Sequence, residues 1–297
     1  MAKFPESAAV FRYFPACLLR VSGPDAATFL QGQFTNDLSK IEPGRAVYGL
    51  WLDRKGRVIA DSHVVRAADE AGFWIASVSS PAPVVARRLG DYIVADDVAI
   101  EDATAGRLGL SLIGAGAGAW LAGEPRAGLF FPGRRDSGES WEWIYPAGDS
   151  DTVDAAISGA RTASSGEMER MRIASGIPSI PADIGPSDLP NEGGLESQAV
   201  SYSKGCYLGQ EVMARLKSMG RVRRALVRVR GDGAPPPVPA ALWSGGRREG
   251  ELRSAVADAG ERGFAGLALV SAASAAGGRP LSLAAGGPPS IEIVPKS

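Results

Sequence analysis

The residues best able to do chemistry are concentrated in one segment, Lys204 to Glu211, which reads KGCYLGQE. It places an ammonium, a thiol, a phenol, an amide and a carboxylate around two glycines. If Lys204 to Cys206 is extended, the ammonium lies on the same side as the thiol and favours the thiolate. Cys206 is then a candidate nucleophile or metal ligand. Alternatively, the glycines only shape a tight strand-to-helix turn, and Cys206 is a small buried hydrophobic residue.

Helical character in Gln210 to Leu216 adds to this segment. A helix that begins near Gly209 would direct its free N–H groups, and the positive end of its dipole, at negative charge held there. Asp61 and His63 lie in the apolar run Val58 to Val65. Most aspartates are solvated or cap a turn. We expect His63 to be a neutral structural histidine rather than an acid–base partner.

Composition excludes several other kinds of site. With one histidine and two cysteines, Cys17 and Cys206, the chain can build neither a multi-histidine site nor a four-cysteine site, and we expect no metal. So few cysteines also favour a reducing compartment over a disulfide scaffold. The net charge of −1 provides no overall field to attract nucleic acid, so we do not expect such a partner, and any anion binding has to be local.

No apolar stretch approaches the roughly 18 to 20 residues that cross a bilayer, and Arg12 interrupts the apolar run near the N-terminus. We therefore expect a soluble, cytoplasmic protein without membrane contact. The length of 297 residues suits two domains of roughly 150 residues each.

The elements that position these residues mix strands with short helices, which predicts an α+β fold. Strands are predicted at Cys17–Val21, Val47–Leu52, Val58–Val65, Phe73–Val78, Val98–Glu101, Leu108–Ile113 and Trp141–Tyr145. Helices are predicted after Ser22, at Pro83–Leu89, at Asp151–Ile157, and from a Ser164–Glu167 capping box to Gly176.

Glycines mark several connections. The turn Asp53 to Gly56 joins two of the predicted strands into a hairpin. The run Gly114 to Gly118 lacks the spacing of a nucleotide-binding loop and predicts a flexible connection. After Gly220, short β-like runs alternate with Gly- and Pro-rich turns, which predicts a small all-β domain at the C-terminus.

The string KGCYLGQE, continuing into Val212–Arg215 and Arg223–Leu226, resembles the signature of the YgfZ family, the folate-binding relatives of the glycine-cleavage T-protein. Further segments resemble other elements of that family in the same order. They are Gly32–Leu38 (GQFTNDL), Leu52–Arg57 (LDRKGR), Arg172–Pro178 (RIASGIP), Leu189–Glu192 (LPNE) and Gly250–Ala255 (GELRSA). The resemblance covers nearly the whole chain.

The resemblance implies three subdomains around a central hole that holds a tetrahydrofolate. We expect two interleaved α+β subdomains in residues 1–220 and a small β-barrel in residues 221–297. It also implies a role in the assembly or repair of iron–sulfur proteins, so the expected partners are folate and iron–sulfur client or assembly proteins. Asp61 falls at the second aspartate of a T-protein element that assists methylene transfer, and Ala60 takes the place of the first.

By this resemblance Cys206, Lys204 and Asp61 are the candidate catalytic residues. The candidate cofactor-binding residues are Gly205, Tyr207, Gly209, Gln210, Glu211, Arg215, Arg223 and Arg172. Seven basic residues and no acidic ones lie between Arg215 and Arg230: Arg215, Lys217, Arg221, Arg223, Arg224, Arg228 and Arg230. They could grip the glutamate tail of folate or a phosphate backbone, or they could form a solvated strand face paired with acids elsewhere.

Three functions therefore stay open. The first is a tetrahydrofolate-binding factor for iron–sulfur proteins that uses Cys206 and Lys204. The second is a folate-dependent aminomethyl or one-carbon transferase in which Asp61 orients or deprotonates a folate nitrogen. The third is an RNA-binding accessory module for tRNA modification that uses the basic stretch.

Overall fold

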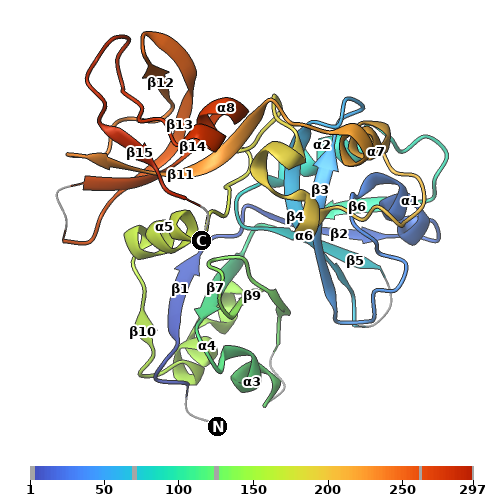
Figure 1. The fold of residues 1–297 in the computed structure, drawn as a ribbon. Helices are drawn as coiled ribbons and strands as arrows, with labels where there is room; N and C mark the ends of the chain where they lie inside the picture. Colours follow the sequence, from blue (N-terminus) through green and yellow to red (C-terminus); the bar gives the residue numbers. More distant parts are fainter. Residues whose placement is uncertain (1–3, 69–71, 124–126, 261–262, 296–297) are drawn as a thin grey trace.

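Three five-stranded sheets make up the β-structure of the described chain, residues 4–68, 72–123, 127–260 and 263–295 of a computed structural model. Figure 1 shows them as three bodies, with the C-terminal sheet in orange and red at one end. The mixed α+β class predicted from the sequence is confirmed. Among the described residues, no helix is long and apolar enough to cross a membrane.

The first sheet has the strand order β3-β4-β5-β2-β6. Its strands are β2 (Cys17–Ser22), β3 (Ala46–Leu52), β4 (Val58–Arg66), β5 (Phe73–Ser77) and β6 (Ala99–Asp102). Helices α1 (Ala26–Gln33) and α2 (Ala82–Gly90) contribute to a shared core that includes Leu19, Leu30 and Val85. The predicted hairpin is present, since β3 and β4 pair antiparallel across the turn at Asp53 to Gly56.

The second sheet, β10-β1-β7-β9-β8, takes one strand from before the first sheet and four from after it. Its strands are β1 (Ala9–Tyr13), β7 (Arg107–Ile113), β8 (Leu129–Pro132), β9 (Ser140–Pro146) and β10 (Arg161–Thr162). Around it lie α3 (Ala117–Ala122), η1 (Ala147–Asp149), α4 (Ser150–Ala156) and α5 (Ser165–Ala174). The Ser164–Glu167 capping box opens α5 as predicted. The prediction of a flexible connection at Gly114–Gly118 is wrong for its last two residues, because Ala117 and Gly118 begin α3. The Glu139 carboxylate also accepts hydrogen bonds from the Gly116 and Gly118 N–H groups.

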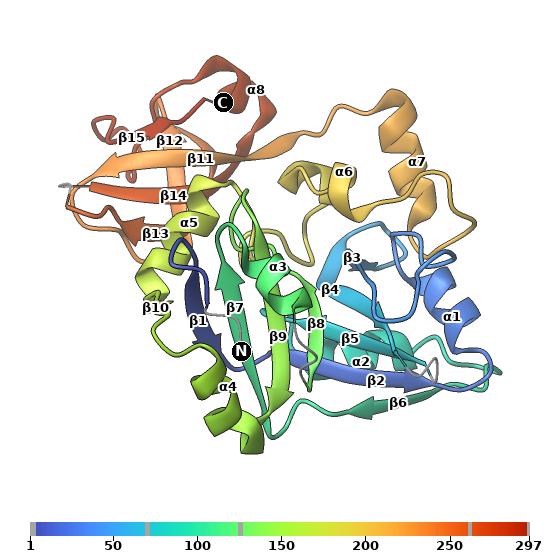
Figure 2. The same ribbon diagram turned by 90° about the horizontal axis from the view of Figure 1, so that it is seen from below.

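The third sheet, β12-β13-β14-β11-β15, is built from the C-terminal part of the chain. Its elements are β11 (Arg224–Asp232), β12 (Ala240–Ser244), β13 (Arg247–Ala257), β14 (Gly263–Ser271), α8 (Ala272–Gly277) and β15 (Ile291–Ile293). Between the second and third sheets in sequence come η2 (Pro190–Gly193), α6 (Glu196–Ala199) and α7 (Gln210–Met219). Figure 2 shows α6 and α7 beside the first sheet, away from β12 to β15.

Two apolar clusters join the three sheets. Leu18 and Val65 of the first sheet pack with Phe131 and Ile144 of the second. A second cluster combines Leu50 and Leu52 of the first sheet, Ile180 and Ile184 of the segment before η2, and Leu226 and Leu267 of the third sheet. The segment between α5 and α6 is therefore part of the apolar core that links the first and third sheets.

Candidate functional site

Strand β4 places Asp61 and His63 in a cavity that also contacts the second sheet. Successive side chains of a strand point to opposite faces. Ala60 and Val64 accordingly lie in the core that contains α1 and α2, whereas Asp61 and His63 line a cavity of about 180 Å³ on the other face. Asp61 is therefore not the solvated residue that is usual for aspartates, and Ala60 contributes nothing to this cavity.

Three hydroxyl groups surround the Asp61 carboxylate. Ser80 Oγ donates to Oδ1 at 2.6 Å and Ser77 Oγ at 3.3 Å, while the Tyr48 hydroxyl donates to Oδ2 at 3.1 Å. Burial raises the pKa of Asp61 above its ordinary value, and these hydrogen bonds together with the charge of Arg134 only partly oppose it. A buried carboxyl with a raised pKa is better suited to accepting and returning a proton than an exposed one.

Arg134 and His63 complete the polar wall around Asp61. The Arg134 guanidinium lies 3.8 Å from the centre of the Tyr48 ring, and its NH2 donates to Gln198 Oε1 at 3.0 Å. His63 lies between the rings of Tyr48 and Phe131, with ring centres 5.2 and 4.8 Å away. Burial, aided by the positive charges of Arg134 and Arg135, lowers the pKa of His63 to about 3. His63 is therefore neutral at physiological pH, as the sequence analysis expected.

A second cavity of about 450 Å³ adjoins the first, because Arg134, Ile177 and Pro178 line both. Its lining includes Asn191 and Glu196. Asn191 Oδ1 and Glu196 Oε2 are buried and lack a hydrogen-bond partner among the described residues. An unpaired buried acceptor costs about 1 to 3 kcal/mol, so such a pair of acceptors in one cavity is a natural feature of a binding site for a molecule with N–H donors.

Arg172, a predicted cofactor-binding residue, lines the smaller cavity, but its guanidinium is already committed. It donates to Asp183 at 2.6 Å, to Glu169 at 2.5 Å and to the Ile177 carbonyl at 2.7 Å. It also donates to Glu169 through Nε at 3.0 Å and to Ser254 Oγ at 2.9 Å. Arg172 therefore holds the cavity wall in place.

Lys204 does not lie where the sequence analysis put it. Residues 204–206 form no strand, so the strand geometry on which that prediction depended is not present. Lys204 Nζ instead donates to the carbonyls of Gln31, Phe34 and Asn36 at 2.7, 2.7 and 2.8 Å. All three ammonium donors are thus used to close the C-terminal end of α1. Burial lowers the pKa of Lys204 to about 8, against an opposing effect of Asp37, so the ammonium form still predominates at neutral pH.

The second half of the segment packs on the β3–β4 hairpin. Gly209 has φ of +85°, and a Cβ there would lie 2.8 Å from the Asp53 carbonyl oxygen. Gly56 has φ of +73°, and a Cβ there would lie 2.9 Å from Val212 Cβ. The Leu208 N–H also donates to the Gly32 carbonyl at 3.1 Å. The three motifs that contain Gly32, Gly56 and Gly209 therefore meet at one close-packed junction.

Cys206 is the exposed thiol of this junction, whereas Cys17 is buried. The neighbouring Tyr207 is buried, which raises its pKa to about 12, and Gln210 Oε1 accepts from the Tyr207 N–H at 3.1 Å. Most of the predicted cofactor-binding residues belong to this junction or the chain just after it, and they line neither of the two adjoining cavities. They are Gly205, Tyr207, Gly209, Gln210, Glu211, Arg215 and Arg223.

The basic stretch divides into paired and exposed side chains. Arg224 forms ion pairs with Asp188 and Glu192, and Arg228 donates to the carbonyls of Ala174 and Pro295. Arg215, Lys217, Arg221, Arg223 and Arg230 are exposed. In the part of the chain that the structure describes, no three His, Cys, Asp or Glu residues are grouped as a metal site.

Sequence reasoning missed most polar residues of the cavities, among them Tyr48, Arg134, Asn191 and Glu196. Tyr48 could have been found, since its register partner on β4 is His63 and it therefore lies beside the Asp61–His63 face. Arg134 follows β8 in a turn-rich stretch with no motif, and nothing in its neighbourhood predicts a cavity. Asn191 was noted only as part of the LPNE turn.

Comparison with known proteins gives consistent results. Residues 5–124 match the family model described as the GCVT N-terminal domain. The chain is 30% identical to the tRNA-modifying protein YgfZ of Edwardsiella ictaluri, covering 77% of this chain and 75% of that one. It is 29% identical to the human mitochondrial iron–sulfur cluster assembly factor IBA57, covering 88% of this chain and 77% of that one.

The fold is also similar to that of a solved structure. The crystal structure of the glycine cleavage system aminomethyltransferase T from Bartonella henselae superposes with a TM-score of 0.80, over 97% of this chain and 85% of that chain. At 19% sequence identity, this likeness establishes a shared fold and leaves the chemistry to be argued from the residues.

Proposed function

This chain belongs to the YgfZ family of GcvT-like proteins, and on that basis we propose that it binds a tetrahydrofolate and supports the assembly or repair of iron–sulfur proteins. The observation that carries the folate part is that two residues lining the larger of two adjoining cavities, Asn191 and Glu196, each have a buried oxygen without a hydrogen-bond partner among the described residues. In this proposal the three sheets are three subdomains, and the two cavities are the central hole that they enclose.

The residues present fit a folate. Its pteridine ring carries amino and ring N–H donors, which match the two unpaired acceptors. The larger cavity, about 450 Å³, lies within the range of small-molecule sites, and the smaller one extends it past Arg134 to Asp61. A ligand that pairs with Asn191 and Glu196 would remove the cost of leaving their oxygens buried and unpaired.

Bound tetrahydrofolate would supply a carrier of one-carbon groups. The protein's own contribution starts from Asp61, whose buried carboxyl can hold a proton at Oδ1 or Oδ2. Tyr48 and Ser80 fix the orientation of that carboxyl, and neutral His63 adds no competing charge. Burial of Asp61 in a medium less polar than water strengthens these polar interactions.

The same geometry favours a second candidate, a folate-dependent one-carbon transferase. Asp61 lines the cavity as a general acid–base residue would, and Ala60 faces the opposite core, so the alanine leaves the cavity's polar groups intact. Transfer of a one-carbon group from an aminomethyl donor to tetrahydrofolate, lost in Asp61→Asn, would support this candidate. Inactivity of the wild type with such donors would remove it.

For the iron–sulfur role we propose that Cys206 is the acting thiol. Cys206 is exposed, and the residues on either side of it are fixed. Lys204 is hydrogen-bonded to carbonyls at the end of α1, and Gly209 packs against the β3–β4 turn. Thiols stay reduced in the cytoplasm, and we propose that the protein acts there. A single thiol can ligate a cluster only with ligands from another molecule. Cys206→Ala should abolish rescue of iron–sulfur enzyme activity in cells lacking the protein, whereas full rescue would exclude the thiol.

Calorimetric titration with tetrahydrofolate, in mono- and polyglutamyl forms, tests the folate part. Glu196→Gln keeps the shape and replaces one oxygen by a donor, so we expect about tenfold weaker binding. Glu211→Gln makes the same change on exposed α7 and serves as the matched control, with unchanged affinity. Absence of binding to the wild type would overturn the folate proposal.

A further inference from the structure

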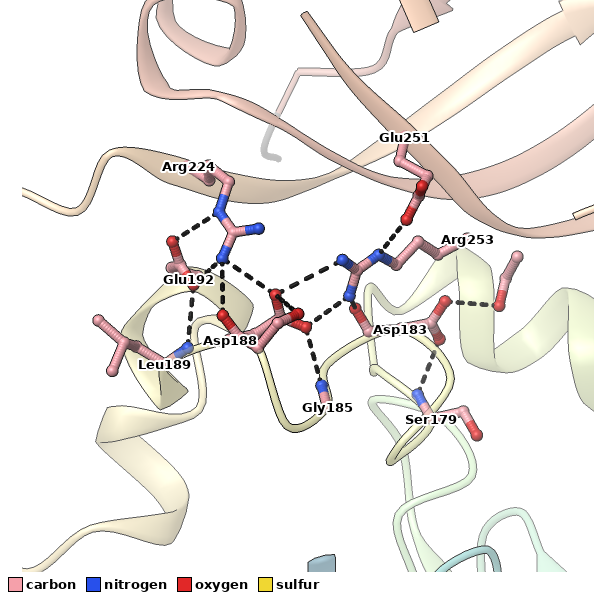
Figure 3. Close-up of polar contacts among 11 residues, drawn as sticks. Ser179, Asp183, Gly185, Asp188, Leu189, Glu192, Arg224, Glu251 and Arg253 are labelled. Atoms are coloured by element: carbon pink, nitrogen blue, oxygen red, sulfur yellow. Dashed lines mark hydrogen bonds and ion pairs between the residues drawn. The ribbon is translucent and has the colours of Figure 1, made fainter. Parts of the chain in front are cut away.

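A network of buried charges connects the third sheet to the cavity wall. We define the wall segment as residues 177–196, because its first residues line the smaller cavity and its last residues line the larger one. Between these ends the segment carries Asp183 and Asp188, both with 0% exposure. Figure 3 shows these carboxylates facing side chains of the third sheet.

Arg253 of β13 makes the shortest of these contacts. Its NH1 donates to Asp188 Oδ2 at 2.5 Å and to the Asp183 carbonyl at 2.9 Å, and its Nε donates to Glu251 Oε2 at 3.1 Å. The neighbouring Ser254 Oγ donates to Asp183 Oδ1 at 2.6 Å. Two consecutive residues of one strand therefore hold both buried aspartates of the wall segment.

Arg224 of β11 holds the wall segment nearer to the larger cavity. Its Nε and NH2 donate to the two oxygens of Glu192 at 2.9 and 2.8 Å, and NH2 also donates to Asp188 at 3.0 Å. Glu192 in turn accepts from the Leu189 N–H at 2.9 Å, which fixes the first turn of η2. The next residue back along the chain is Asn191, which lines the larger cavity and whose Oδ1 is buried without a hydrogen-bond partner among the described residues.

The two arginines of this network hold the buried Asp188 carboxylate between them. Burial raises the pKa of Asp188, but the hydrogen bonds and charges of Arg253 and Arg224, with the Gly185 N–H, outweigh it and leave the pKa below its ordinary value. A buried carboxylate that loses such a partner has to reorient or bind water. The turn that carries Asp188 would then shift, together with the cavity residues on either side of it.

We propose that Arg253 and Arg224 are positioning residues for the ligand. From the third sheet they fix the wall segment so that Ser179 faces the smaller cavity and Asn191 and Glu196 face the larger one. This inference rests on the proposed folate function for its consequence in binding. Its structural half, the ordering of residues 177–196 by two arginines of another sheet, can be measured without any ligand.

The test combines two readouts on Arg253→Met in the full chain. We expect hydrogen exchange of peptides from residues 177–196 to accelerate about tenfold while β11, β13 and β14 keep their protection. We expect tetrahydrofolate affinity to fall about tenfold with unchanged stoichiometry. Arg247→Met removes an 82% exposed arginine from the same strand and is the matched control for both readouts.

Milder variants keep the test decisive if Arg253→Met fails to fold. Ser254→Ala removes one donor to Asp183. Arg224→Lys keeps the charge but loses the bidentate hydrogen bonding to Glu192. Unchanged exchange in the wall segment of these variants, or exchange raised across the whole third sheet, overturns the inference. So does acceleration of the wall segment with affinity within twofold of wild type. If the wild type binds no folate, the proposed function fails, and the exchange data alone decide whether the arginines order the wall.

Discussion

The Cys206 junction and the Asp61 cavity are the two regions with candidate chemistry, and they are built in opposite ways. The junction comes largely from one continuous motif, and most of its polar groups already have hydrogen-bond partners. Lys204 donates to three carbonyls, and Gln210 accepts from a backbone N–H. The cavity is assembled from separate segments, and it keeps unpaired acceptors on Asn191 and Glu196. In this chain the polar groups of the dense motif are mostly paired within the protein, whereas the unpaired acceptors lie where separate segments meet.

This difference assigns the two regions different kinds of sensitivity. Substitutions in the junction should mainly lower stability, with Cys206 as the exception because its side chain is exposed and supports nothing. Substitutions in the cavity should mainly lower ligand affinity, except where a buried charge is left without its partner. The predictions below test this division.

The largest effect is expected from Gly209→Ala. The left-handed backbone of Gly209 disfavours any side chain, and the new Cβ would lie 2.8 Å from the Asp53 carbonyl oxygen. We expect a loss of about 3 to 4 kcal/mol in the free energy of unfolding, measured by urea denaturation. Gly205→Ala in the same motif is the control, because a Cβ at Gly205 has no neighbour within 4 Å. Equal stability of the two variants would contradict the close-packed junction.

Lys204→Met should have the next largest effect. It leaves three carbonyls at the end of α1 without their donor, so we expect a loss of about 2 to 3 kcal/mol in unfolding free energy. Lys55→Met, an exposed lysine of the β3–β4 turn, should cost less than about 0.5 kcal/mol. If Lys204→Met instead slows alkylation of Cys206 and leaves stability unchanged, the ammonium serves the thiol, and the division between the two regions fails.

A smaller, pH-dependent effect is expected from His63. Its pKa is about 3 in the folded protein and near 6.5 when unfolded, so protons bind the unfolded chain first as the pH falls. The free energy of unfolding that neutral, buried His63 contributes above pH 6.5 is then lost progressively as the pH falls toward 3. Between pH 7.5 and 5.0 we expect the wild type to lose about 2 kcal/mol more than His63→Gln, by urea denaturation at both values. Parallel losses in the two proteins would show that His63 is not buried as described.

The sequence predicted most of the scaffold because those signals are local. Strand patterns predicted the β3–β4 hairpin, and the Ser164–Glu167 capping box predicted the start of α5. The prediction for Lys204 assumed a strand through Cys206, and the structure has no strand there. The side chain reaches α1, about 170 residues earlier, and such a contact has no local signature.

The cavity was less predictable for the same physical reason. Asp61 was identified through the resemblance, but its burial depends on Ser80 and Tyr48, which only tertiary packing brings to it. Arg134 follows β8 of the second sheet and Glu196 opens α6 beside the first, and neither belongs to any of the motifs. Their proximity follows from how three sheets pack, which single-sequence periodicity does not contain.

The smallest effect is expected from the exposed basic residues, and it tests the boundary of the cavity. Arg223 and Arg215 line neither adjoining cavity, so Arg223→Gln should change the affinity for tetrahydrofolate by less than about twofold. Arg134→Gln, which removes the cation shared by both cavities, should weaken it about tenfold. Calorimetric titration with mono- and polyglutamyl tetrahydrofolate measures both affinities and shows whether either arginine contacts the ligand. A loss in Arg223→Gln confined to the polyglutamyl form would mean that the ligand's tail reaches the basic stretch, and that the junction takes part in binding after all.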